Sequence, residues 1–351
     1  MRLRRADCSG PGLRRIRRGR GFSYLDERGD RITDPETLLR IRELAIPPAW
    51  EDVWICSDPC GHLQATGTDA ADRKQYLYHP LWRARRDREK FERALRFARS
   101  LPQLRRGVCA DLGRDGLDRE RVLACAARLL DRGLFRVGSD EYAEADSGIG
   151  LATIRKEHLS FANETAQFDY PGKGGIRRVQ SIGDPESIEM LRALKRRHGG
   201  GEGLLAYRNG RRWAPIHAED INDYLKAHMG EEFTAKDFRT WNATMLAAVV
   251  LAVDGRAATT KTARRRAINA AVREVAEVLG NTPAVARRAY IDPRLFDRFQ
   301  AGVTIAPALR RRKEIDLEEE RMRTRVEKAV LKLLSEKRFP ASSGSTECPR
   351  L

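Results

Sequence analysis

The sequence predicts an α+β protein in which a small, mostly β N-terminal domain precedes a mainly α-helical domain that carries a β-hairpin. Three observations lead to this prediction: short strand-like segments up to residue 79, helical periodicity after Pro80, and a glycine-rich insertion at residues 168–179. With 351 residues, the chain is long enough for two domains.

In the N-terminal region, short runs rich in β-branched and aromatic residues predict strands. Residues 21–25 form the first of them, and the turn-rich stretch 26–30 that follows predicts a hairpin connection. Residues 46–50 contain two consecutive prolines and cannot form a regular helix. Further strands are predicted at 53–56, 63–66 and 76–78.

After Pro80 the spacing of apolar residues changes to that of helices. Residues 82–100 are dense in Arg and Lys with interleaved apolar residues, which predicts a basic helix. A second helix is predicted at 119–130, with a stop at Gly133. Residues 243–253 are apolar on nearly every side, so the helix predicted there should be deeply buried.

Local start and stop signals delimit the remaining helices. Residues 263–279 have one apolar face, and Gly280 supplies the C-terminal stop. A cap residue followed by proline, at Thr282 and again at Asp292, predicts two short helices. Beyond Pro307 a charged helix is predicted, with an apolar stripe formed by Met322, Val326, Val330 and Leu333.

The overall charge of the chain indicates the kind of partner. Lys and Arg number 67 against 50 Asp and Glu, which gives a formal net charge of +17. An excess this large favours a polyanionic partner, most commonly nucleic acid, although a basic protein can also lack any particular partner. No apolar run approaches the roughly 20 residues that cross a bilayer, so no membrane association is expected.

The N-terminus and the cysteines indicate the compartment. Eight of the first twenty residues are arginines, but no apolar segment follows, which excludes a secretory signal. The composition also fits an organellar transit peptide, whereas the folded pattern from Gly21 onward favours a short basic arm. Cys56 and Cys60 lack a second Cys or His pair to complete a zinc site. We therefore expect all six cysteines to be reduced thiols in a cytoplasmic protein.

Four segments contain candidate functional residues, and each has an ordinary structural explanation when it is taken alone. Arg136 follows an apolar helix, where arginine usually caps the helix or forms a surface pair. Lys173 lies between glycines, as a hairpin-tip lysine often does. Arg239 could form an ion pair with Asp237, and a tyrosine that ends a short helix, such as Tyr290, usually only packs.

Taken together and in order, these segments resemble the tyrosine-dependent strand-transferase superfamily, and specifically the poxvirus-like bacterial type IB DNA topoisomerases. The segments are FRVGS (135–139), YPGKGG (170–175), TAKDFRTW (234–241), and a fourth in which LGNTP (279–283) runs on to RRAYI (287–291). Four further segments resemble the strand-rich domain of that family: IPPAW (46–50), VWI (53–55), GHLQATG (61–67) and RKQYLYH (73–79). The resemblance covers residues 21–308.

The resemblance assigns the catalytic roles to Arg136, Lys173, Arg239, Asn281 and Tyr290. Two guanidiniums suit the charge that develops on the non-bridging oxygens of a phosphodiester in the transition state. Tyr290 would attack phosphorus to form a 3′-phosphotyrosyl bond, helped to ionise by the neighbouring cations. Lys173 would protonate the departing 5′ oxygen.

Asn281 departs from the family pattern, because many members have histidine at this position. An amide can donate a hydrogen bond to a non-bridging oxygen but cannot shuttle a proton, so hydrogen bonding is its only catalytic role. The alternative is that Asn281 is a helix cap next to Thr282.

The resemblance implies a type I DNA topoisomerase that relaxes supercoiled DNA by cutting and religating one strand. The phosphotyrosine conserves the energy of the broken bond, so resealing needs no nucleotide, and the sequence contains no Walker-type loop. No cluster of carboxylates or histidines indicates a bound metal. We therefore expect neither ATP, nor a metal ion, nor any other cofactor.

Gln75, Tyr76 and Tyr78 match family positions that contact double-stranded DNA. Glutamine can hydrogen-bond an adenine edge, and tyrosine can stack on a base or reach a phosphate. Strand alternation places Tyr76 and Tyr78 on one face, which suits either a DNA-binding surface or a core.

The architecture implied by the family is two lobes that close around duplex DNA as a C-shaped clamp, in a monomeric, nucleoid-associated bacterial protein of the cytoplasm. The expected organisation is a basic N-terminal arm at 1–20, a β-rich DNA-binding domain at 21–82, a helical catalytic domain at 83–309, and a charged helix with a disordered tail at 310–351.

Two other functions stay open at this point. A site-specific tyrosine recombinase has the same nucleophile and a similar set of cations. Recombinases usually carry His-x-x-Arg where this chain has residues 236–239, and usually begin with a helical DNA-binding domain. The third possibility, a catalytically inactive DNA-binding protein, is disfavoured by the ordered presence of Arg136, Lys173, Arg239 and Tyr290.

Overall fold

The computed structural model describes residues 1–138, 148–309 and 315–336. The chain divides into two compact units, Met1–Glu92 and Arg93–Leu351. The first is built on an antiparallel sheet, and the second is mainly helical with small sheets, which confirms the predicted α+β class. The predicted clamp concerns the placement of the two units around DNA, and it stays a prediction.

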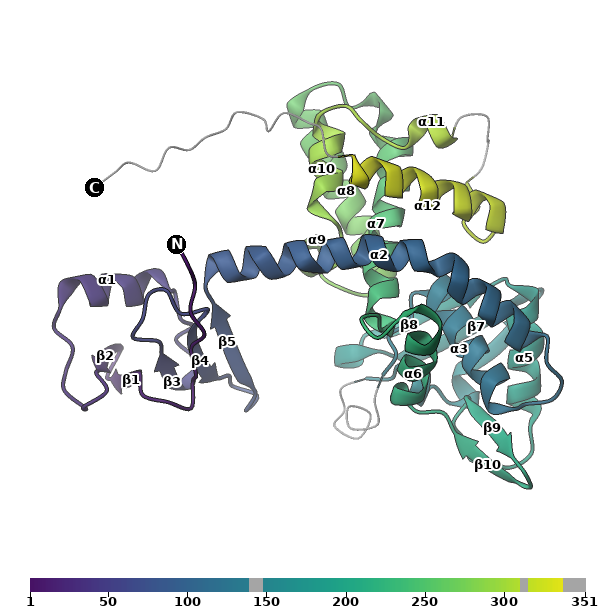
Figure 1. The fold of residues 1–351 in the computed structure, drawn as a ribbon, viewed down its shortest axis with the longest axis horizontal. Helices are drawn as coiled ribbons and strands as arrows, with labels where there is room; N and C mark the ends of the chain where they lie inside the picture. Colours follow the sequence, from purple (N-terminus) through teal and green to yellow (C-terminus); the bar gives the residue numbers. More distant parts are fainter. Residues whose placement is uncertain (139–147, 310–314, 337–351) are drawn as a thin grey trace. The chain divides into compact units, whose positions relative to one another are not determined.

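The first unit contains one five-stranded sheet in the order β2-β1-β3-β4-β5, with every pair of neighbours antiparallel (Figure 1). Helix α1 (Pro35–Glu43) covers the sheet, and its Ile41 is buried with Val53, Ile55 and Ala65 in a small core. The strands are β1 (Leu13–Arg18), β2 (Gly21–Leu25), β3 (Glu51–Ile55), β4 (Leu63–Thr68) and β5 (Lys74–Tyr78).

Two features of this unit differ from the sequence-based expectation. The segment expected to be a basic arm includes β1, which pairs with both β2 and β3 because Leu13 supplies an inward-facing side chain. Its Arg15 donates hydrogen bonds to the carbonyls of residues 46, 47 and 50, so part of the N-terminal arginine content is structural. Helix α1 was not predicted, although Asp34 caps it by accepting from the backbone N–H of Thr37 at 2.8 Å.

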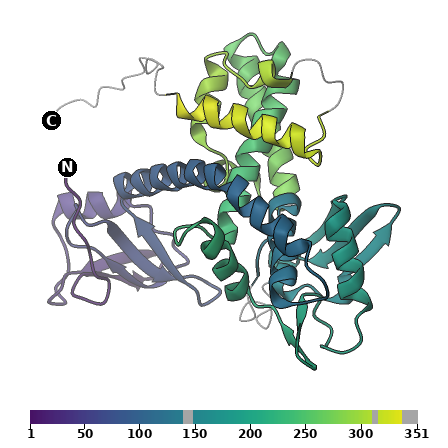
Figure 2. The ribbon, with the colours of Figure 1, turned by 45° about the vertical axis from the view of Figure 1, so that its right-hand side comes forward.

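The second unit packs its helices around a single large core (Figure 2). Helix α7 is buried on nearly every side, as predicted. Its helices are α3 (Arg119–Gly133), α5 (Pro185–Arg196), α6 (Ala218–Met229), α7 (Ala235–Val253), α8 (Lys261–Leu279), α9 (Pro283–Ala289), α10 (Pro293–Gln300), α11 (Ala306–Leu309) and α12 (Glu320–Ser335).

Helix α2 (Pro80–Leu112) runs across the division of the chain and is longer than the helix expected at 82–100. It continues through Pro102 because a buried apolar stripe, with Leu101, Leu104 and Val108, extends beyond the proline. Packing of that stripe outweighs the hydrogen bond that proline removes.

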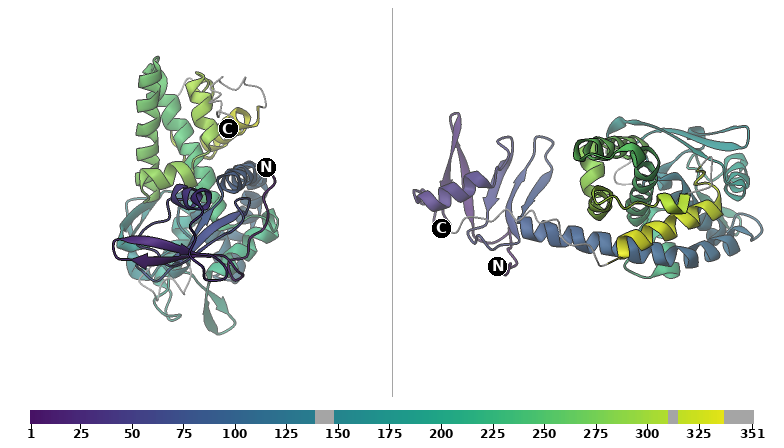
Figure 3. Two further views of the ribbon diagram at one scale, coloured as in Figure 1. Left: turned by 90° about the vertical axis from the view of Figure 1, so that its left-hand side faces the viewer. Right: turned by 90° about the horizontal axis from the view of Figure 1, so that it is seen from above.

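The glycine-rich insertion forms the hairpin expected there, as part of a three-stranded sheet in the order β6-β7-β8 (teal in the right-hand view of Figure 3). The strands are β6 (Leu159–Ala162), β7 (Thr165–Pro171) and β8 (Arg177–Ile182), and a separate hairpin joins β9 (Ala206–Asn209) to β10 (Arg212–Pro215).

The charged helix predicted beyond Pro307 is α12, and its predicted apolar stripe is buried against α7, α10 and α11. A charged network also holds it in place. Arg323 of α12 donates to the backbone oxygen of Asp131 at 2.6 Å and to Asn242 Oδ1 at 2.9 Å. Arg105 of α2 bridges the carboxylates of Asp131 and Glu327. The tail expected after this helix lies outside the described residues.

Candidate functional site

Arg136 reaches the site from the segment that follows α3. The helix ends at Gly133, and the left-handed backbone of the next residue, Leu134 (φ 57°), turns the chain sharply. The half-buried Arg136 then donates from Nη2 to Asn281 Oδ1 at 2.9 Å. Within the described part of the chain, Arg136 therefore contacts Asn281 and neither caps α3 nor pairs with a carboxylate.

Arg239 lies in the N-terminal part of the buried helix α7 and is only 4% exposed. It donates to Leu279 O at 2.8 Å, to Asn281 Oδ1 at 3.0 Å and to Leu134 O. All of these acceptors are uncharged. Asp237, the expected partner, instead binds Arg93 at 2.9 Å, so the ion-pair explanation of Arg239 is wrong.

The charge on Arg239 is held at an energetic cost. Burial, and then the neighbouring Arg136, lower the pKa of Arg239 to about 10, which still leaves it charged at neutral pH. Two adjacent guanidiniums that share an uncharged acceptor, instead of a carboxylate, form a strong site for an anion.

Asn281 connects the two arginines. Helix α8 ends at Leu279, and the C-cap residue Gly280 adopts a left-handed conformation (φ 60°) that directs the chain into Asn281. The N-cap of α9 is Thr282, whose Oγ1 accepts from the backbone N–H of Val285 at 3.3 Å, so the cap explanation of Asn281 is wrong. Since its Oδ1 accepts from Arg136 and Arg239, the amide orientation is defined and the NH₂ group faces elsewhere.

Tyr290 follows the short helix α9 and is 8% exposed. The Cζ atom of Arg239 lies 5.3 Å from the centre of its ring. Burial by itself raises the pKa of Tyr290, but the charges and hydrogen bonds of Arg239 and Arg136 outweigh burial, and the net pKa is lowered. The only other buried tyrosine near these arginines within the described ranges, Tyr170, shows the opposite result, because burial raises its pKa.

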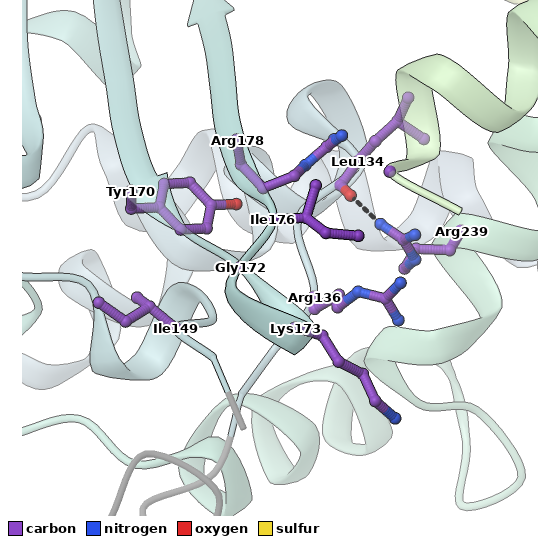
Figure 4. Close-up of a pocket in the computed structure, with 10 residues that line it drawn as sticks. Leu134, Arg136, Ile149, Tyr170, Gly172, Lys173, Ile176, Arg178 and Arg239 are labelled. Atoms are coloured by element: carbon purple, nitrogen blue, oxygen red, sulfur yellow. Dashed lines mark hydrogen bonds between the residues drawn. The ribbon is translucent and has the colours of Figure 1, made fainter. Parts of the chain in front are cut away.

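Lys173 lies at the tip of the β7–β8 hairpin, where Gly174 and Gly175 have positive φ values of 74° and 71°. Its side chain is exposed and has no hydrogen-bond or ion-pair partner among the described residues. It borders a small pocket together with the arginines (Figure 4). The pocket is lined by Leu134, Arg136, Ile149, Tyr170, Gly172, Lys173, Ile176, Arg178, Arg239 and Gly280.

One residue of this pocket, Arg178, was not predicted. It lies on β8, where alternation turns Arg177 to the surface and Arg178 inward. The sequence signal that could have identified it is the pair Arg177-Arg178 after the glycine-rich tip. Neighbouring strand residues point to opposite faces, so one arginine of the pair faces the site.

The structure therefore brings the five predicted residues of the second unit together, with Arg239 at their centre. Arg136, Asn281 and Tyr290 interact with Arg239, and Lys173 shares its pocket. Their catalytic roles stay predictions.

The residues predicted to contact DNA from the first unit lie on β5. Tyr76 and Tyr78 are 45% and 37% exposed and stack on each other, with ring centres 6.2 Å apart. They form a surface and not a core. Gln75 points to the other side of the strand, where its Nε2 donates to Asp69 Oδ2 at 2.8 Å.

Three of the expectations concern metals, thiols and membranes. Within the described ranges, no three or more His, Cys, Asp or Glu side chains are placed to hold a metal ion. The cysteines described there, Cys8, Cys56, Cys60, Cys109 and Cys125, are free thiols, and Cys348 lies outside these ranges. Every helix in this part of the chain is too short or too polar to form a membrane span.

Comparison with known proteins identifies the families that this chain resembles. Residues 79–303 match the family of the eukaryotic DNA topoisomerase I catalytic core, and residues 21–69 match the bacterial DNA topoisomerase IB N-terminal domain. The chain is 29% identical over 287 residues to DNA topoisomerase 1B of Acanthamoeba polyphaga mimivirus, covering 80% of this chain and 85% of the viral protein.

Longer cellular proteins match over a smaller region. DNA topoisomerase 1 of Candidozyma auris is 28% identical over 161 residues, and that of Drosophila melanogaster is 25% identical over 166 residues. Each match covers 45% of this chain but only 20% and 16% of the fungal and insect proteins, respectively.

Proposed function

The chain belongs to the DNA topoisomerase I family of type IB enzymes, and we propose that it cuts one DNA strand through a covalent bond to Tyr290 and then reseals it. The observation that carries this proposal is the position of a buried tyrosine with a lowered pKa next to two arginines that, among the described residues, share an amide oxygen instead of a carboxylate. The family match favours this function over the tyrosine recombinase that stayed open from the sequence.

In the cleavage step, Tyr290 Oη loses its proton to solvent and attacks the phosphorus of a phosphodiester. A bond forms between Oη and phosphorus, and the bond between phosphorus and the 5′ oxygen breaks. Arg136 and Arg239 bind the non-bridging oxygens, whose negative charge increases in the transition state. The lowered pKa of Tyr290 supports its role, because ionisation of an ordinary phenol is unfavourable near neutral pH.

Lys173 supplies the proton that the departing 5′ oxygen needs. Its exposed ammonium on the hairpin tip has no partner among the described residues and is available to a substrate. A guanidinium is a poorer proton donor, because it stays protonated at any physiological pH. Religation is the reverse reaction: the 5′ hydroxyl attacks the phosphotyrosine, and the amine of Lys173 accepts the proton.

Asn281 has two functions in this proposal. Its oxygen holds Arg136 and Arg239 at a fixed separation, and its NH₂ group donates a hydrogen bond to a non-bridging oxygen. Histidine can provide the second function, but a neutral imidazole has one acceptor nitrogen and cannot serve both arginines while also donating to the phosphate.

We also propose that neither a metal ion nor a nucleotide takes part. The two guanidiniums already supply positive charge at the scissile phosphate, and the phosphotyrosine retains the energy of the ester bond. DNA is also held by the first unit, through the stacked Tyr76 and Tyr78 and the neighbouring Lys74 on the same face of β5. Gln75 could reach a base only after releasing Asp69.

The decisive experiment is relaxation of supercoiled plasmid in EDTA without ATP, by the wild type and by Tyr290→Phe. The wild type should relax the plasmid and form a covalent adduct that mass spectrometry maps to Tyr290. Tyr290→Phe should bind DNA nearly as well but form no adduct, because only the attacking oxygen is lost. An absolute requirement for magnesium or ATP, or an adduct on Tyr170, would refute the proposal.

A further inference from the structure

Arg178 joins the hairpin that carries Lys173 to the end of helix α8. From β8, its Nη2 donates to Val278 O at 2.6 Å and its Nη1 to Glu277 O at 3.3 Å. These carbonyls belong to the last turn of α8, where the helix dipole favours a cation. The next residues along the chain are Gly280 and Asn281, so this contact lies directly beside the site.

The surrounding chain leaves space for this side chain. A Cβ atom on Gly280 would lie 2.5 Å from Arg178 Nη1, and one on Gly172 would lie 2.7 Å from Arg178 Cγ. Real Cβ atoms do not approach other atoms so closely. The residue that ends α8 and the residue that begins the hairpin tip therefore both accommodate Arg178.

A second contact anchors the hairpin from the same face of β8. Gln180, also on β8, donates to Gly133 O at the end of α3 and accepts from Tyr170 Oη at 2.5 Å. The hairpin is thus attached to the two segments that lead to Arg136 and to Asn281. Lys173, by contrast, has no partner of its own within the described ranges and is followed by two glycines.

We propose that Arg178 is a positioning residue, which holds the hairpin so that Lys173 reaches the 5′ oxygen of the scissile bond. This inference rests on the proposed function, in which Lys173 is the proton donor. In Figure 4, Arg178 is drawn above Arg136 and Arg239, and Lys173 is drawn below them. Arg178 acts on the reaction through the hairpin and not through the phosphate.

The test compares cleavage of two duplex substrates under single-turnover conditions with saturating enzyme. One has an ordinary phosphodiester, and the other has sulfur in place of the bridging 5′ oxygen. A thiolate leaves without a proton, so the second substrate bypasses the proton donor. Removing a general acid typically slows a reaction about 10²–10⁴-fold. Misplacing the acid should cause part of that loss, so we expect Arg178→Ala to slow cleavage of the oxygen substrate about 10–10²-fold.

The expected result is that Arg178→Ala is slow on the oxygen substrate and within a few-fold of wild type on the sulfur substrate, as Lys173→Ala should be. Arg136→Ala should stay slow on both substrates. The double variant Arg178→Ala/Lys173→Ala should be no slower than Lys173→Ala alone, because both changes remove the same step. Arg177→Ala is the matched control: this neighbouring arginine pairs with Asp169 on the surface and should retain nearly full activity.

The outcomes separate this inference from the proposed function. If sulfur rescues Lys173→Ala but not Arg178→Ala, Arg178 contacts the phosphate directly and only the positioning role is refuted. If sulfur rescues neither variant, Lys173 is not the proton donor and both proposals fail. An Arg178→Ala variant with wild-type activity on oxygen also refutes the inference. Arg178→Lys, which keeps the charge but cannot donate to both carbonyls through a planar fork, should show a smaller loss that sulfur also rescues.

Discussion

Substitution of Asn281 by alanine removes the one oxygen that accepts hydrogen bonds from both Arg136 and Arg239. It also removes the NH₂ group that we propose donates to the scissile phosphate. The two guanidiniums would repel each other without a common acceptor, and the phosphate would lose one donor. Cleavage should therefore slow markedly, while the helices on either side of the position stay formed.

The magnitude follows from the two contributions. A hydrogen bond to a charged group contributes about 1.5–3 kcal/mol, and Asn281 accepts two at 2.9 and 3.0 Å. Water can replace part of this at a half-buried position. Loss of one donor to a developing oxyanion typically costs about 10²–10³-fold in rate. We expect a cleavage rate reduced by about 10²–10³-fold, with at most a few-fold change in DNA affinity.

Two further substitutions separate the roles of the oxygen and of the NH₂ group. Asn281→Asp keeps an acceptor for both arginines but places a negative charge where the phosphate binds, so it should be at least as slow as Asn281→Ala. Asn281→His can donate to the phosphate but can accept from only one arginine, so it should be intermediate.

The assay is formation of the covalent adduct on a suicide duplex in a single turnover. Thr282→Ala is the control, because Thr282 is the actual cap of α9; it should lose about 1 kcal/mol of stability but keep cleavage within a few-fold. Cleavage by Asn281→Ala within a few-fold of wild type would refute the reasoning. Equal slowing of the Thr282→Ala control would show that helix stability, not hydrogen bonding, was measured.

Three other measurements test the electrostatics. Arg136→Ala removes a cation that helps to lower the pKa of Tyr290, so the alkaline rise of the cleavage rate with pH should move to higher pH; an unchanged profile would contradict this. DNA affinity should fall linearly on a log–log plot against salt concentration, with a slope of several units, and a flat plot would place the excess charge outside the interface. Burial by itself raises the pKa of Asp131, but the charges of Arg105 and Arg323 outweigh burial, and the net pKa is lowered. The ionised carboxylate therefore stabilises the fold above about pH 4, the pKa of an unfolded aspartate. This stability is lost when acid protonates the carboxylate. Asp131→Asn should lose about 3–5 kcal/mol in urea unfolding at neutral pH and show a weaker dependence of stability on acid, whereas an unchanged midpoint would contradict the importance of the network.

The sequence by itself determined the elements whose signals are local. Gly280 after an apolar helical face marked the end of α8, and a cap residue before proline marked the starts of α9 and α10. Backbone dihedral preferences and side-chain periodicity act over a few residues, so they can be recognised without the fold. The candidate residues, in their order along the chain, also indicated the family, because the segments that carry them resemble its motifs.

Only the tertiary structure decided how those residues interact. Arg136 and Asn281 are 145 positions apart in the chain, and nothing near either residue shows that they share a hydrogen bond. The same holds for β1, which is a strand because β2 and β3 pair with it, and for Arg178, whose acceptors lie about a hundred positions further on. An arginine-rich segment has the same sequence pattern whether its side chains face solvent or donate hydrogen bonds to backbone carbonyls. What distinguishes them is which distant segments the folded core brings within hydrogen-bond distance.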